Sequence, residues 1–381
     1  METKLLQLLT RKLPQLFVIK KDKTKICVMN LKEAQEKKKH ISDTIASKLV
    51  VAHNSPHDIF PGIGLKPNHD KNELEVVIHV IDEAQGRYVK EWLGGKEDVD
   101  IEITGIAYAY ANSTNRSSQH SLSMGASISR SEATSQPGTL GCFVQRQDDP
   151  SLMILSNTHV LCDISRNRGN IGDNILLPAW RDGGNPEAHL IATLAGFDER
   201  LMRAIHGNDH RFDNENHNPP IVDAAIAQLC DDQTNMGEIN KIHNDRYLQG
   251  IRDQDSLMQV SVELGLENYP VFKFGRVTGL TQGRIDDIQL DRPIHYGLNE
   301  NGQTCSHKFL EMIIIKGEED KPFSRSGDSG SLIYDSEGYA IALLVGGTLS
   351  SKDGNGPPLT YALPIDRVFD ILKICLPSSL H

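Results

Sequence analysis

From Gly138 onward, short apolar runs recur with turn-forming residues between them, and this pattern constrains the fold more than any other feature of the chain. Each run suits one strand, and Gly, Asn, Asp and Pro stand between the runs. Many short strands joined by turns are typical of a β-barrel or a β-sandwich. The runs are Leu140–Val144, Met153–Leu155, Ile175–Leu177, Val222–Leu229, Val271–Phe274, Met312–Ile315, Ser331–Tyr334 and Ile341–Val345.

The two ends of the chain have a different pattern. Pro364–Leu376 carries apolar residues at helical spacing, which predicts a C-terminal helix. The first part predicts a small α/β unit, with helices over 31–48 and 84–93 and strands over 74–81 and 99–107. Residues 111–137 are rich in Ser, Asn, Gly and Arg, and we expect a linker or a loop at the edge of an active site. We therefore expect an N-terminal α/β accessory region over 1–115 and a mainly β domain over 116–381.

Composition excludes several classes of function. The formal net charge is −11 and the pI is about 5.7, which disfavours nucleic-acid binding because that requires clustered positive charge. No run approaches the roughly 18 apolar residues that span a membrane, and the N-terminus does not fit a secretory signal. Scattered cysteines without a C-x-x-C pair predict buried thiols in a reducing compartment, so we place the protein in the cytoplasm. These cysteines are Cys27, Cys142, Cys162, Cys230, Cys305 and Cys375.

The sharpest local signal for chemistry is the segment Gly327-Asp328-Ser329-Gly330, which precedes an apolar strand. A serine between glycines can sit on a tight turn with its hydroxyl exposed, and the amides of Gly327 and Ser329 can point together at an anion. A plain turn between two strands would fit the same residues. Taken alone, the segment therefore leaves both interpretations open.

A nucleophilic serine needs a base, and the base needs a carboxylate that orients it. His159 follows a strand end and the small polar residues Ser-Asn-Thr, and Asp223 lies inside an apolar run. Burial of a carboxylate without a partner is costly, so Asp223 is expected to have one, and a histidine is a natural choice. The chain order His159, Asp223, Ser329 matches one known triad architecture and excludes the other two.

Five segments together resemble the trypsin-like (chymotrypsin-fold) serine peptidases over residues 120–381, with the closest likeness to intracellular bacterial members related to the plant narrow-leaf serine proteases. A weaker resemblance extends over residues 62–105. The five segments that carry the resemblance over residues 120–381 are Gly138–Cys142, Leu155–Leu161, Val222–Ala227, Gly275–Gly283 and Phe323–Ser331.

The resemblance implies two six-stranded antiparallel barrels, the second starting near residue 265, with the catalytic residues in the cleft between them. His159 and Asp223 would come from the first barrel and Ser329 from the second. His159 would take the Ser329 proton, Asp223 would orient His159, and the amides of Gly327 and Ser329 would bind the oxyanion. Such chemistry needs no cofactor and no metal.

The same resemblance suggests a pair of residues that supports the oxyanion loop. Related bacterial enzymes pair the aspartate before the serine with an internal cation ahead of a Gly-x-x-Thr-Gly turn. Lys273 stands in the matching place, so we expect an ion pair between Lys273 and Asp328. The alternative is that Lys273 is an ordinary surface lysine on a strand.

The resemblance also implies which three residues form the primary specificity pocket. Phe323 would form the pocket floor, and Gly346 and Gly347 would leave room in its wall for a small or medium apolar side chain. Val345 replaces a serine that often supports the triad aspartate, which leaves the support of Asp223 open.

Weaker candidates have simpler explanations. The cluster His206, Asp209, His210, Asp213 and His217 fits no metal spacing and is expected to be a solvated loop. The basic run over 37–40 is expected to be a solvent-exposed helix face.

The sequence therefore predicts a serine endopeptidase that acts on a dedicated intracellular protein or peptide substrate, in a regulatory or defence role, and a homo-oligomer is compatible with it. Two rivals remain: a catalytically idle protease fold that binds peptides, and a hydrolase for small esters.

Overall fold

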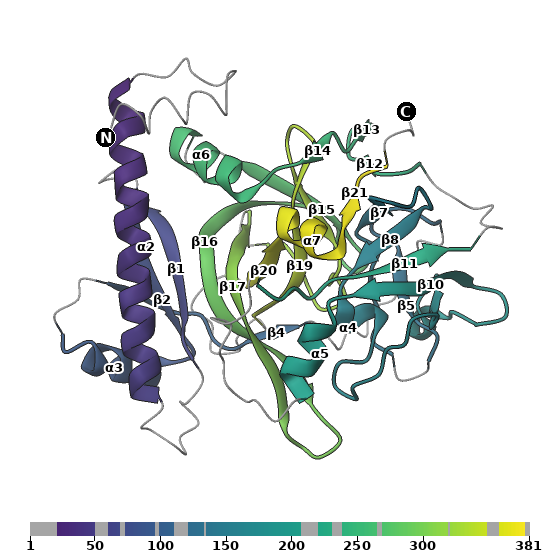
Figure 1. The fold of residues 1–381 in the computed structure, drawn as a ribbon, viewed down its shortest axis with the longest axis horizontal. Coiled ribbons are helices and arrows are strands. Elements are labelled where there is room, and N and C mark those ends of the chain that lie inside the picture. The colour runs from purple at the N-terminus through teal and green to yellow at the C-terminus, as the bar shows by residue number, and fades with distance from the viewer. Residues whose placement is uncertain are drawn as a thin grey trace.

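The computed structural model describes residues 21–49, 60–68, 73–95, 99–109, 121–132, 135–206, 220–230, 238–264, 269–318, 321–348 and 358–377. Two mainly antiparallel sheets form the body of the molecule, with helices on their outside (Figure 1). The helices with more than one turn are α2 (Lys21–Leu49), α3 (Glu83–Trp92), α5 (Glu199–His206), α6 (Gln254–Leu264) and α7 (Ile365–Leu372).

The first sheet has eight strands in the order β21-β7-β8-β11-β10-β9-β5-β6. Its core is the apolar cluster around Phe143, Ile154 and Ile175, all fully buried. Serine side chains are also buried in β5, where Ser129 Oγ accepts a hydrogen bond from the Trp180 N–H at 3.0 Å. The strands are β5 (Ser127–Arg130), β6 (Gly138–Thr139), β7 (Cys142–Arg146), β8 (Met153–Ser156), β9 (Asn174–Leu176), β10 (Leu190–Phe197), β11 (Ala225–Leu229) and β21 (Ile374–Cys375).

The second sheet contains a closed barrel, because its path β15-β18-β19-β20-β17-β16 returns through a β15–β16 pairing. Its two longest strands, of 20 and 14 residues, form one hairpin that extends well beyond the other strands. The strands of this barrel are β15 (Pro270–Gly275), β16 (Gly279–Leu298), β17 (Thr304–Gly317), β18 (Leu332–Asp335), β19 (Tyr339–Thr348) and β20 (Leu359–Pro364).

The N-terminal region continues the second sheet. Its strands β1 (Gly62–Asn68), β2 (Glu73–Val80) and β3 (Asp100–Ile103) add to the outer edge of β16, and α2 lies against β1 and β2 (Figure 1). Ile41 and Ile45 of α2 are fully buried in that contact. A further short strand, β4 (Ala107–Ala109), leaves this edge and inserts between β16 and β19.

The mainly β class, the C-terminal helix and the N-terminal α/β region are confirmed. Three details of the prediction are wrong. The expected strand over 99–107 is broken at 104–106 into β3 and β4, and part of the expected loop over 111–137 forms β5 because its serines bond inside the protein. Within the basic run, Lys38 is buried and pairs with Asp291 at 2.8 Å, so this helix face is not all solvent-exposed.

The cysteines whose side chains the structure describes are free thiols, and Cys142, Cys162 and Cys305 are buried. In the same part of the chain, no helix has both the length and the apolar character needed to cross a bilayer.

A buried acid–base pair lies where the N-terminal strands join the barrel. His79 Nε2 lies 2.7 Å from Asp287 Oδ2, and both side chains are fully buried. Burial, assisted by the nearby Arg292, lowers the pKa of His79 to about 3, whereas burial raises the pKa of Asp287 well above its usual range. Both shifts favour the neutral form, since the surrounding protein solvates charge poorly.

We expect the Asp287 carboxyl to make stability depend on pH. The unfolded chain releases this proton near pH 4, whereas the folded protein keeps it to higher pH. Relative to an Asp287→Asn protein, the wild type should therefore lose stability as pH rises above about 4, by up to about 1.4 kcal/mol per pH unit until Asp287 ionises in the folded state. Urea unfolding of both proteins between pH 5 and 8 measures this difference, and a difference that is constant with pH would contradict the assignment.

Candidate active site

His159 and Asp223 are positioned by two neighbouring segments of the first sheet. His159 lies in α4 (Thr158–Leu161), the single turn that follows β8, and Asp223 lies just before β11. The small polar residues between β8 and His159 bind the backbone of the second segment: Asn157 Nδ2 donates to the Asp223 carbonyl at 2.7 Å, and Thr158 Oγ1 donates to the Ala224 carbonyl at 3.0 Å. These bonds hold the two segments side by side and satisfy backbone groups that are buried there.

The structure brings the two side chains into direct contact. His159 Nδ1 lies 2.6 Å from Asp223 Oδ2, and the His159 backbone N–H donates to Asp223 Oδ1 at 3.2 Å. Since a carboxylate accepts, Nδ1 carries the proton in this contact. The other ring nitrogen, Nε2, is buried and has no hydrogen-bond partner among the described residues, so it presents a lone pair to an incoming donor. This is the orientation that a general base requires.

Tyr296 completes the surroundings of Asp223. Its hydroxyl donates to Asp223 Oδ2 at 3.0 Å, and its ring lies 5.7 Å, centroid to centroid, from the His159 ring. Burial, with Asp223 adding to it, raises the pKa of Tyr296 well above its usual range, so the hydroxyl remains a donor. Sequence reasoning missed this residue. The one clue in the sequence was Val345, which replaces the serine whose hydroxyl would have supported Asp223, so that another donor was needed.

Ser329 lies at the same junction of the two sheets. Its carbonyl accepts a hydrogen bond from the Thr139 N–H at 2.8 Å, and a Cβ placed on Gly138 would lie 3.0 Å from that carbonyl and 2.4 Å from Val160, the neighbour of His159. The Ser329 side chain is fully buried, and its Oγ donates to the Val345 carbonyl at 2.9 Å. No hydrogen bond joins Ser329 to His159 within the described residues.

The amides of Gly327 and Ser329 donate no hydrogen bond to another described residue, and both residues are buried. The loop holds them by a left-handed backbone at Gly327, whose φ is 101°, and by a hydrogen bond from Thr139 Oγ1 to the Gly327 carbonyl at 3.0 Å. Two unsatisfied amides of this kind can stabilise negative charge on an oxygen.

Asp328 and Lys273 lie together under this loop, and both side chains are fully buried. Lys273 Nζ is 3.4 Å from Asp328 Oδ2, and the Thr278 hydroxyl connects them by accepting from Lys273 at 2.6 Å and donating to Asp328 at 2.7 Å. Asp328 also accepts from the backbone N–H groups of Arg325 and Val277 at 3.0 and 2.8 Å. Burial lowers the pKa of Lys273, and Asp328 opposes that shift. The surface-lysine alternative for Lys273 is wrong.

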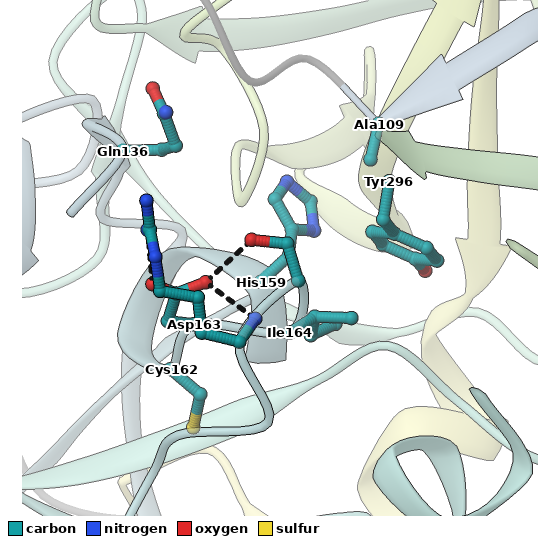
Figure 2. A pocket seen from close by; sticks show the side chains of 9 residues that line it. Ala109, Gln136, His159, Cys162, Asp163, Ile164 and Tyr296 are labelled. Carbon is teal, nitrogen blue, oxygen red and sulfur yellow. Dashed lines mark hydrogen bonds and ion pairs between the residues drawn. The ribbon is translucent and has the colours of Figure 1, made fainter. Parts of the chain in front are cut away.

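A small pocket opens beside His159. In Figure 2 the His159 ring lies between Gln136 on one side and Ala109 and Tyr296 on the other. Gln136 Oε1 is a second buried polar atom without a hydrogen-bond partner among the described residues, and it lines the same pocket as His159. Because buried polar atoms are nearly always paired, two unpaired atoms at one pocket indicate a place for a polar ligand. Sequence reasoning had no signal for Gln136.

The residues expected at the specificity pocket have other surroundings. Phe323 is fully buried in the apolar core, with Lys273 Nζ 5.5 Å from its ring centroid. Gly346 and Gly347 pair with Ala109 and Tyr108 of β4, and a Cβ on Gly346 would lie 2.0 Å from the Tyr108 carbonyl oxygen. The room expected beside these glycines for a substrate side chain is therefore filled by β4.

The expected solvated loop from His206 to His217 lies outside the described residues, apart from His206 itself. The His206 side chain contacts the Ile164 carbonyl. Within the described part of the chain, no three His, Cys, Asp or Glu side chains are grouped as metal ligands would be.

Comparisons with known proteins give structural neighbours only. No protein-family model matches the chain, and no curated protein matches its sequence. Among solved structures, Thermobifida fusca protease A is similar with a TM-score of 0.39 and 13% identity, over 67% of this chain and 98% of that chain. A Nocardiopsis protease has a TM-score of 0.39 and 12% identity, over 68% of this chain and 99% of that chain. A similarity this low leaves activity to be judged from the site itself.

We expect the buried Lys273 to be essential for stability. In a Lys273→Met protein the ammonium is lost and Asp328 remains buried without its countercharge, which typically costs about 3–5 kcal/mol of unfolding free energy. Urea unfolding measures the loss. The matched control is Lys316→Met, which removes a partly exposed ion pair with Asp286 and should cost less. Equal losses in the two variants would contradict a structural role for the Lys273–Asp328 pair.

Proposed function

We propose that this protein is a serine endopeptidase in which Ser329 is the nucleophile, His159 the general base and Asp223 the residue that orients His159. The observation that carries the proposal is the His159–Asp223 contact of 2.6 Å, together with a buried His159 Nε2 that has no partner among the described residues. The free amides of Gly327 and Ser329 add the anion-binding element.

The reaction begins when the Ser329 hydroxyl leaves the Val345 carbonyl and donates its proton to His159 Nε2. Oγ then bonds to the carbonyl carbon of the substrate, and the carbonyl oxygen becomes an oxyanion held by the amides of Gly327 and Ser329. When the C–N bond breaks, the His159 imidazolium gives its proton to the leaving amine. Water repeats the sequence on the acyl-enzyme: His159 takes its proton, the ester bond breaks, and the proton returns to Ser329.

Access to this site is narrow, which supports a restricted choice of substrate. Ser329 is fully buried, and the pocket beside His159 is small. We therefore propose a dedicated protein substrate inside the cell, in a regulatory or defence role, and only slow cleavage of other proteins such as casein.

A catalytically idle peptide-binding protein is the second candidate. The observation that favours it is the Ser329 hydroxyl bonded to the Val345 carbonyl, an arrangement that does not activate the oxygen. A fluorophosphonate separates the two candidates because it reacts only with an activated serine. Digestion of casein then separates a peptidase from a hydrolase of small esters.

We expect a fluorophosphonate probe to label the wild type at Ser329 and to leave a Ser329→Ala protein unlabelled, with mass spectrometry locating the adduct. Asp223→Asn should slow labelling by about 10⁴-fold, because His159 then loses the partner that fixes its tautomer. Ser324→Ala, which removes a buried hydroxyl bonded to Thr360 Oγ1 at 2.6 Å, is the control and should label like the wild type. An unlabelled but folded wild type would favour the idle protein.

We expect Tyr296→Phe to lower kcat about tenfold and to leave KM unchanged, since one hydrogen bond to the Asp223 carboxylate is lost and the ring that lines the pocket is kept. The control is Tyr334→Phe, which removes a hydroxyl that bonds His243 at 3.1 Å away from the site. Steady-state kinetics on a casein-derived peptide measure both variants. A Tyr296→Phe protein that loses thermal stability but keeps its kcat would show that Tyr296 is only structural.

A further inference from the structure

The strand β4 lies on the part of β19 nearest to Ser329. Val345, whose carbonyl accepts from the Ser329 hydroxyl, is followed in β19 by Gly346 and Gly347. These two glycines pair antiparallel with Ala109 and Tyr108. Ala109, the last residue of β4, also lines the pocket that contains His159 (Figure 2). β4 therefore runs toward the candidate catalytic residues along the strand next to them.

Both sides of β19 are occupied at this point. Gly346 and Gly347 pair with Tyr361 and Thr360 of β20 on one side and with β4 on the other. An extended peptide binds a sheet by adding to a free edge, where backbone hydrogen bonds provide affinity. No such edge is free beside Ser329 while β4 is in place, and another peptide can pair there only if β4 leaves.

The close packing of β4 against β19 requires glycine at position 346. A Cβ on Gly346 would lie 2.0 Å from the Tyr108 carbonyl oxygen and 3.0 Å from the Ala109 Cα, so only glycine permits this approach. Ala107 and Ala109 are almost fully buried, and Tyr108 also pairs with His295 of β16. β4 thus lies between β16 and β19, and its small side chains are buried there.

One buried arginine holds the two residues of the connection that leads into β4. Arg292 Nη1 donates to Thr104 Oγ1 at 2.6 Å, and Nη2 donates to the Gly105 carbonyl. Thr104 and Gly105 connect β3 to β4, so the position of β4 depends on the N-terminal strands that add to β16. A segment held this way is present at high effective concentration and competes with peptides in solution.

From this arrangement we infer that β4 is an internal occupant of the peptide-binding edge and restrains the enzyme until it is displaced. The inference rests on the proposed function, because it assigns the regulation of that same site. A substrate must supply an extended segment with small side chains that replaces Ala107–Ala109 on β19.

A reversible cross-link tests the inference. Ala107 and Thr348 are directly opposite in the register, and such pairs lie within the range of a disulfide, so an Ala107→Cys/Thr348→Cys protein can lock β4 in place. We expect oxidation to slow digestion of fluorescein-labelled casein by about tenfold or more, and reduction to restore it. The Thr348→Cys protein under the same oxidant is the control and should show no such change.

A second measurement does not require activity. A blocked, fluorescent peptide with the sequence of residues 104–109 should bind a Tyr108→Pro protein, in which proline weakens the pairing of β4. It should not bind the oxidised double-cysteine protein, and a Tyr108→Phe protein, which keeps the backbone donor, should bind it no better than the wild type. Fluorescence anisotropy measures binding. If Tyr108→Pro does not fold, the reduced and oxidised double-cysteine proteins provide the same comparison.

The outcomes separate the two proposals. Fluorophosphonate labelling of Ser329, with casein digestion unchanged by oxidation, would overturn the restraint by β4 and leave the peptidase intact. Absence of labelling would remove the peptidase, and the anisotropy comparison alone would then decide whether β4 occupies a peptide-binding edge. Equal peptide binding to locked and unlocked proteins, or binding to neither, would overturn that occupancy.

Discussion

The geometry of the candidate site depends first on the buried Asp328. Its carboxylate accepts hydrogen bonds from the backbone of Arg325 on its own loop and from Val277 and Thr278 on the turn after β15. One charged group therefore fixes two loops relative to each other, and Lys273 balances its charge from below. Since the amides of Gly327 and Ser329 flank Asp328, their direction follows from this bonding.

The N-terminal region is structurally part of the domain that holds the candidate site. Its strands extend the sheet whose strand β18 follows the Ser329 loop, and β4 returns from that edge to pair with β19 next to Val345, to which the Ser329 hydroxyl donates. An accessory region attached by a linker could act on the site only by docking. In the proposed restraint the acting segment is a strand that pairs with β16 and β19, so we expect displacement of the N-terminal strands to expose the peptide-binding edge.

Much of the site could be predicted from the sequence, because it rests on local patterns with distinct chemistry. The turn around Ser329, the polar residues before His159 and the carboxylate in an apolar run each carry their own signal, and the structure brings all three to one junction. Tyr296 and Gln136 could not be predicted. Tyr296 contacts Asp223, which is distant in sequence, whereas Gln136 only lines the pocket, and neither has a neighbouring motif.

The errors in the fold prediction have a similar origin. The strand expected over 99–107 contains Gly105, whose φ of 70° interrupts it, and this glycine was a local sign of the break. Nothing local indicates that the second half of the segment pairs with β19. The glycines at 346 and 347 were interpreted as space for a substrate side chain. Glycine in a strand allows another group to approach the backbone closely, but the sequence does not say whether that group belongs to a ligand or to the chain itself.

The long strand β16 connects these features. Its register with β17 shifts four times, so its side chains do not simply alternate between two faces. Such irregularities bend a strand and redirect side chains. As a result, one strand directs Asp287 to His79, Arg292 to the start of β4 and Tyr296 to Asp223. A shift of register by one residue would turn these side chains to the opposite face and separate all three contacts. The support of Asp223 and the placement of β4 therefore depend on the same backbone.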